Sequence, residues 1–150
     1  MTARSKRLAA LLEGGLTMPT RIMVNGAPDV RLASNDRSVL NHFERSRLVG
    51  AEWERVMWLL KESFGGTEVG RYNIPVTVAF KVRLPKGIHR DSMNLSEALK
   101  VWLDVLTLGT RTRDGIGLLW GDDARWVRST SQELDMTGGE PYTEIRIVPV

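Results

Sequence analysis

Two periods of apolar residues run along the chain and predict the order of its elements. Every second residue is apolar over residues 74–84, which predicts a long half-buried strand. The apolar positions of that strand are Val76, Val78, Phe80, Val82 and Leu84. Residues 142–150 alternate in the same way, and shorter apolar runs predict further strands at 20–24 and at about 125–134.

Two other segments carry apolar residues at spacings of three and four, which is typical of helices that bury one face. The first runs from Ser46 to Phe64, and its stripe consists of Val49, Trp53, Val56, Met57, Leu60 and Phe64. The polar residues Glu52, Arg55, Lys61 and Glu62 fall largely off this stripe. We interpret the stripe as a packing surface, because aromatic residues at helical spacing are usually buried in a core.

The second helix begins near Asn94, which forms a capping-box pattern with Glu97 three residues later. Its apolar face is Leu95, Ala98, Leu99, Trp102, Leu103 and Leu106. The resulting order is strand, helix, strand, helix, strand, strand, without an internal repeat. This order predicts a single α+β domain in which helices pack on one mixed sheet of about four to five strands.

The domain is expected to cover residues 18–150, and residues 1–17 are expected to form an accessory arm. No apolar stretch approaches the length of a membrane span, so no membrane partner is expected. The short apolar run after the basic start is not followed by a small-residue cleavage site, which argues against a signal peptide. These features favour a soluble, cytoplasmic protein.

Composition narrows the possible chemistry. The chain has 150 residues, with 42% hydrophobic and 26% charged, and no cysteine. The lack of cysteine excludes disulfides, cysteine-ligated zinc and iron–sulfur clusters. Only His42 and His89 could supply imidazole, so a catalytic metal would be held by oxygen ligands, which favours Mg²⁺ or Mn²⁺. The net charge of +3 comes mostly from arginine, whose planar fork matches phosphate geometry.

Acidic residues stand at both ends of the segment that contains the second helix. Asp91 precedes the helix, and Asp122 and Asp123 follow the polar loop of residues 107–117. Carboxylates gathered from separate elements repel one another unless a cation neutralises them, and a divalent ion can also polarise a phosphoryl oxygen. The pattern therefore indicates metal-dependent phosphoryl chemistry as a hypothesis.

Other polar residues have both a functional and a local interpretation. Lys100 shares the polar face of its helix with Glu97 and Asp104, and spacing alone favours an intrahelical charge ladder over a phosphate-binding lysine. Asn35 and Arg37 either contact DNA or form local capping interactions, and the local interpretation is favoured.

Short motifs along the chain resemble, in order, the signature of RusA-type Holliday junction resolvases. They are Asn35-Asp36-Arg37, Trp53-Glu54-Arg55, Asp91-Ser92-Met93-Asn94-Leu95, Leu99-Lys100, Asp104-Val105-Leu106 and Trp120-Gly121-Asp122-Asp123-Ala124. The phage versions of the family place the lysine six residues past the asparagine, as Lys100 stands past Asn94 here. The resemblance spans most of residues 20–150.

The resemblance implies a homodimeric, Mg²⁺-dependent endonuclease that nicks four-way DNA junctions symmetrically and is encoded by a phage or prophage acting in a bacterial host. It implies that Asp91, Asp122 and Asp123 bind the metal, and that Lys100 contacts the scissile phosphate. Asn94 would hold the acidic loop by hydrogen bonds. Basic residues are expected to contact backbone phosphates; they are Arg37, Arg83, Lys86, Arg90, Arg111 and Arg113.

One position departs from the family pattern. Met93 stands where the family has its second aspartate, and methionine is a poor ligand for a hard cation. Glu97 or Asp104 could supply a replacement carboxylate. The alternative hypothesis is a protein of RusA fold that binds branched DNA and has weak or lost cleavage. The stretch between Asp104 and Asp122 also looks longer than in the family, which leaves the position of the acidic pair open.

Overall fold

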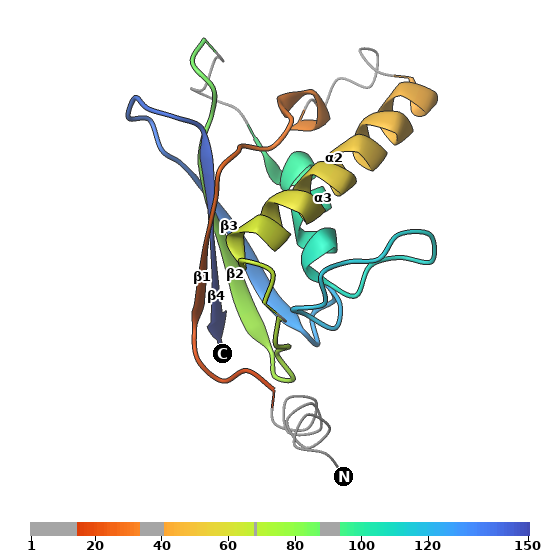
Figure 1. Cartoon of the computed structure of the whole chain (residues 1–150), viewed down its shortest axis with the longest axis vertical. Coiled ribbons are helices and arrows are strands. Elements are labelled where there is room, and N and C mark those ends of the chain that lie inside the picture. Colours follow the sequence, from red (N-terminus) through yellow and green to blue (C-terminus); the bar gives the residue numbers. More distant parts are fainter. Residues whose placement is uncertain (1–14, 34–40, 68, 88–93) are drawn as a thin grey trace.

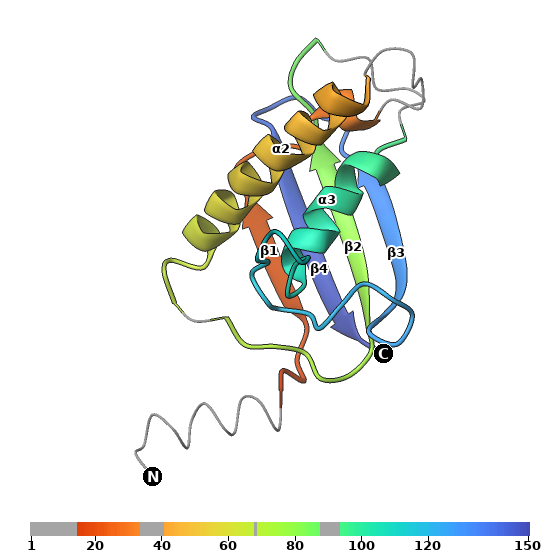
Figure 2. The same cartoon turned by 90° about the vertical axis from the view of Figure 1, so that its right-hand side faces the viewer.

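The computed structural model describes residues 15–33, 41–67, 69–87 and 94–150, which form one four-stranded sheet with two helices on a single face (Figures 1 and 2). The strands are β1 (Thr20–Val24), β2 (Val76–Arg83), β3 (Val127–Leu134) and β4 (Tyr142–Pro149). Their order across the sheet is β1-β4-β2-β3. Strand β4 is antiparallel to both neighbours, whereas β2 and β3 are parallel. The predicted α+β class and the mixed sheet are confirmed.

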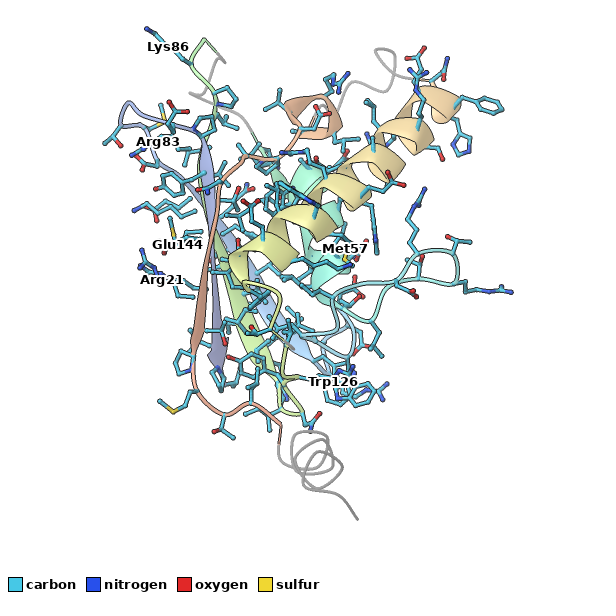
Figure 3. All side chains as sticks on the ribbon, viewed as in Figure 1. Arg21, Met57, Arg83, Lys86, Trp126 and Glu144 are labelled. Atoms are coloured by element: carbon cyan, nitrogen blue, oxygen red, sulfur yellow. The ribbon has the colours of Figure 1, made fainter. Side chains whose placement is uncertain are left out.

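Strand β2 shows the predicted alternation most clearly, because it lies inside the sheet between β4 and β3. The side chains of Val76, Val78, Phe80 and Val82 are at most 3% exposed and face the helices, and the residues between them are half-buried on the other face. Pro75, just before the strand, has no N–H to donate, but its carbonyl accepts from the Val150 N–H (2.9 Å). The uncovered face of the sheet carries charged side chains, including the ion pair of exposed Arg21 with buried Glu144 (Figure 3).

Two helices and one short 3₁₀ helix complete the described fold. They are η1 (Val30–Ala33), α2 (His42–Ser63) and α3 (Ser96–Leu106). Helix α2 starts four residues before the predicted position, because the Asn41 side chain accepts a hydrogen bond from the Glu44 N–H (2.8 Å) and caps the helix there. The predicted apolar stripe of α2 is confirmed as a packing surface, with its main buried side chains at Trp53, Val56 and Leu60.

The prediction that Glu52 lies off the buried stripe of α2 is wrong. Glu52 is only 3% exposed, and its carboxylate forms hydrogen bonds with three separate parts of the fold. Oε2 accepts from the Asp29 N–H (2.7 Å) and from Trp102 Nε1 (3.2 Å), and Oε1 accepts from Arg55 Nε (2.7 Å). A buried carboxylate with these donors ties the chain before η1 to both helices.

The capping box predicted at the start of α3 is also wrong. Leu95 occupies the N-cap position and forms no side-chain capping bond. The side-chain oxygen of Asn94, Oδ1, instead accepts from the Ser96 N–H (2.9 Å), and Glu97 forms an ion pair with Arg45 of α2 (2.9 Å). The apolar face predicted for this helix is nevertheless buried, with Trp102 and Leu106 fully enclosed.

The packed domain extends slightly beyond its predicted start at residue 18. The Leu16 N–H donates to the Arg71 carbonyl (2.8 Å), and the Leu16 side chain packs against the core. Most of the predicted arm, residues 1–14, lies outside the described residues. Within the described residues, no helix is long and apolar enough to cross a membrane.

Candidate functional site

The Lys100 ammonium lies between two carboxylates at the surface of α3. Nζ donates to Asp104 Oδ1 (2.8 Å), one helical turn on, and to Asp122 Oδ2 in the turn that precedes β3. The ion pair along the helix is half of the ladder that spacing favoured, because Glu97, the other predicted member, pairs with Arg45 instead. The second contact joins residues 22 positions apart and so brings two of the separate motifs together.

The loop between α3 and β3 returns Asp122 to Lys100 because it folds back against the end of the helix. Backbone N–H groups of the loop donate to the last carbonyl groups of the helix, which would otherwise be unpaired. The bonds are Ile116 N to Val105 O (2.7 Å), Leu119 N to Leu106 O (3.0 Å) and Gly117 N to Thr107 O (2.9 Å). Leu118 and Leu119 are each 1% exposed and anchor the returning chain in the core.

The loop comes closest to the end of α3 at Gly115, where only glycine fits. A Cβ atom at Gly115 would lie 2.0 Å from the Thr107 carbonyl oxygen, so any side chain there would force the loop away from the helix. The long segment between Asp104 and Asp122, which left the position of the acidic pair open, therefore forms a loop that is hydrogen-bonded to the end of α3.

The three groups of this cluster shift one another's protonation. Burial raises the pKa of Asp104 and outweighs the opposite effect of Lys100. The hydrogen bond from Lys100 lowers the pKa of Asp122. Burial opposes the charge of Lys100, but its hydrogen bonds to Asp104 and Asp122 prevail and raise its pKa. The pKa values of the two carboxyl groups are thus shifted in opposite directions around one ammonium. Perturbed pKa values of this kind are typical of functional sites.

A cavity of about 120 Å³ with both polar and apolar walls adjoins this cluster between α3 and the edge strand β3. Its lining residues are Phe80, Ser96, Leu99, Lys100, Leu103, Thr130, Ser131 and Gln132. The polar members come from the first turns of the helix and from the strand. A cavity of this size has room for roughly four water molecules, or for a group as small as a phosphate.

Gln132 is a site residue that the sequence did not indicate. Its Nε2 donates to Asn94 Oδ1 (3.0 Å), which links the residue just before α3 to the middle of β3. Both described bonds of the Asn94 side chain go to residues that follow it in the chain, Ser96 and Gln132. Residues 88–93 lie outside the described chain, so the expected bonds from Asn94 to the acidic loop stay a prediction. Gln132 was missed because β3 has little apolar alternation to show which face each residue occupies.

The remaining acidic candidates have other partners. Asp123 is 59% exposed at its side chain, and its Oδ1 accepts from the Arg125 N–H (2.9 Å), which shapes the turn before β3. Among the described contacts, Lys100 thus meets Asp122 rather than Asp123. Glu97 is held by Arg45. Asp91 lies outside the described residues, so its place in the site stays a prediction.

Over the described part of the chain, no group of three or more histidine, aspartate or glutamate side chains comes together as a metal site. Asp104 and Asp122 both contact the Lys100 ammonium, so their oxygen atoms converge on one positive charge. Carboxylate oxygens are the donors that Mg²⁺ prefers, and this pair would supply two of the several ligands that such an ion needs.

The basic residues predicted to bind DNA differ in their surroundings. Lys86 and Arg111 are exposed, and Figure 3 shows Lys86 projecting from the end of the molecule opposite Trp126. Arg113 is half-buried and packs against Gly50. Arg83 pairs with Asp135 (3.0 Å) and lies over Tyr142 on the sheet. Arg37 and Arg90 lie outside the described residues.

Asp135 is the centre of the network that engages Arg83. Its carboxylate accepts hydrogen bonds from the Thr137 hydroxyl and N–H, from the Tyr142 hydroxyl and from Arg83. The bonds from Thr137 and Tyr142, together with the charge of Arg83, hold the pKa of Asp135 well below its usual range. Arg83 therefore stabilises the connection between β3 and β4.

The Asp135→Asn variant should lose stability in a pH-dependent manner. Because the folded-state pKa of Asp135 lies below its unfolded value of 3.8, ionised Asp135 stabilises the fold above that value, and this stabilisation disappears as pH falls through the folded-state pKa. Urea unfolding should show a difference between wild type and variant that is largest near about pH 7 and shrinks toward about pH 2. Glu140→Gln, exposed in the same turn, is the control; equal differences at all pH values would contradict the prediction.

Comparisons with known proteins add no family assignment. No protein-family model matches the chain, and a search of curated proteins gives no match.

Proposed function

We propose that this chain is a metal-dependent endonuclease of the RusA type that nicks branched DNA, with the four-way junction as its substrate and a homodimer as its working form. The observation that supports the proposal is the contact of Lys100 with both Asp104 and Asp122, beside a cavity that Lys100 itself lines. All three residues belong to the motifs that resemble the family. A lysine beside paired carboxylates is an arrangement suited to binding a phosphate and a divalent cation together.

Mg²⁺ would be held by Asp104 and Asp122, with Asp91 as a third ligand. When bound, the ion would activate a water molecule and neutralise charge on the phosphoryl group. Lys100 would donate from Nζ to a phosphate oxygen and stabilise the charge that develops in the transition state. The exposed Arg111 would add a phosphate contact away from the cluster, which makes binding weaken as salt rises.

The proposal is tested with a labelled four-way junction in Mg²⁺ or Mn²⁺, beside linear duplex of the same sequence. The expected result is paired nicks near the branch point, which disappear in EDTA while junction binding in a gel shift persists. Binding without nicking at every metal concentration would contradict the nuclease proposal.

A second candidate function rests on Met93. If this residue deprives the site of one acidic ligand, the chain binds branched DNA without efficient cleavage. The variant Met93→Asp should then nick junctions that the wild type only binds. If Met93→Asp also fails to nick junctions, the missing acidic ligand is not the cause of the lost cleavage.

Gln132→Ala should reduce the rate of nicking by about tenfold, as loss of an outer hydrogen-bond partner commonly does. The reason is that Asn94 loses its bond from β3, so the segment that leads into α3 is less firmly positioned. The rate constant kcat should fall while the Kd for junctions stays within about twofold. Glu133→Gln, an exposed neighbour on the same strand, is the control. An equal loss of binding and rate would argue against a positioning role.

A further inference from the structure

Four side chains form a continuous stack on the surface next to the candidate site. The Arg71 guanidinium lies 4.4 Å from the centre of the Trp120 ring, and the Trp120 and Trp126 rings are 6.2 Å apart with 35° between their planes. The Arg125 guanidinium lies 5.9 Å from the Trp126 ring. We refer to Arg71, Trp120, Trp126 and Arg125 as the Arg–Trp stack.

The inner half of the Arg–Trp stack is fixed by hydrogen bonds. Arg71 Nε donates to the Gly117 carbonyl (2.9 Å), and Trp120 Nε1 donates to Asn73 Oδ1 (2.6 Å). These bonds determine where the first indole stands. Its position therefore does not depend on a ligand.

Both indoles and the outer guanidinium of the stack reach solvent. The Arg125 side chain is 76% exposed, Trp120 is 37% exposed and Trp126 is half-buried. Figure 3 shows Trp126 beyond the lower end of α3, at the outside of the molecule. Packing of the core does not require a second indole and a second guanidinium at this position, because the buried anchors of the loop are Leu118 and Leu119.

One turn presents both the stack and the candidate catalytic residue. Trp120 and Trp126 flank Asp122 in the chain, and the Asp123 carbonyl accepts from the Trp126 N–H (3.0 Å), which closes the turn. The side chain of Asp122 reaches Lys100, while the indoles stack on the other part of the turn. A strand of DNA at Lys100 would therefore meet the Arg–Trp stack within a few nucleotides.

We propose that the Arg–Trp stack binds an unpaired nucleobase and its phosphate beside the scissile phosphodiester. The base takes the place of the Arg125 guanidinium on the Trp126 ring, and Arg125, which is mostly exposed, contacts the adjoining phosphate instead. Indoles stack with any base, because every base has a π face, and arginine can serve both ring and phosphate. The inference rests on the proposed function: the stack would favour DNA whose bases are unstacked at a branch point over continuous duplex.

The test measures binding of a fluorescein-labelled oligo-dT by anisotropy in EDTA, where no cleavage occurs. Trp126→Ala should weaken binding by about tenfold, and Trp126→Phe should keep most of it. Trp58→Ala, which removes an indole that is 64% exposed on α2, is the matched control and should bind as the wild type does. Arg125→Ala should weaken binding and lower its salt dependence, and Arg125→Lys should restore the salt dependence.

Equal affinities of the wild type, Trp126→Ala and Arg125→Ala for oligo-dT would overturn the proposal. A loss of affinity in Trp126→Phe as large as in Trp126→Ala would overturn it too, because a phenyl ring still offers a stacking face. Junction nicking separates this result from the proposed function. Oligo-dT binding that depends on Trp126 without any nicking supports the stack and rejects the nuclease, whereas nicking with no dependence on Trp126 in binding rejects the stack alone.

Discussion

Replacing Lys100 with methionine should lower the single-turnover rate of junction nicking by about 10²–10³-fold, the cost typical of removing one donor to a developing oxyanion. Methionine keeps much of the volume of the side chain but cannot donate to a phosphate oxygen or neutralise the two carboxylates. The measurement is nicking of a labelled junction at saturating Mg²⁺. Lys61→Met, at an exposed lysine of α2, should leave the rate unchanged.

The same variant distinguishes a site residue from a structural ion pair. If Lys100 only supports the charge ladder with Asp104, Lys100→Met should change the free energy of unfolding by less than about 1 kcal/mol and leave nicking intact. That outcome would contradict the proposed role. Lys100→Arg should retain partial activity, because the guanidinium keeps the charge but changes its geometry.

Replacing Glu52 with alanine should lower the free energy of unfolding by about 2–4 kcal/mol, because a buried hydrogen-bond donor that loses its acceptor costs about 1–3 kcal/mol. The Arg55 guanidinium would lose its carboxylate, and the Asp29 N–H and Trp102 Nε1 would lose their acceptor. Urea unfolding followed by circular dichroism measures the loss.

Glu54→Ala is the matched control for this stability prediction, since Glu54 is exposed on the same helix and should change stability by no more than about 0.5 kcal/mol. Glu52→Gln should be milder than Glu52→Ala, because the amide oxygen can still accept one of the bonds. Equal stabilities of Glu52→Ala and Glu54→Ala would show that the buried carboxylate does not hold the two helices together.

The local elements of the fold could be predicted because each depends on neighbours within a few residues. Alternation over 74–84 identified β2, and spacings of three and four identified α2 and α3, since side-chain direction repeats every two residues in a strand and every 3.6 in a helix. The boundary of α2 was missed because capping by Asn41 depends on one side-chain bond and not on the apolar pattern.

The burial of Glu52 could not be predicted in this way. A glutamate at the margin of a helical stripe is normally solvated, and only the donors brought by Asp29 and Trp102 make its burial favourable. Those donors lie in separate elements, so the pattern along α2 contains no information about them.

In the candidate site, too, the contacts within one helix could be predicted, whereas those between separate elements could not. The amino-acid sequence determined that Lys100 and Asp104 share one face of a helix, because residues four apart are neighbours on a helix surface. Only the tertiary structure decided that Asp122 joins them and that Gln132 supports Asn94. The physical reason is that these contacts depend on how the loop of residues 107–126 bonds to the end of α3 and on how β3 aligns beside β2.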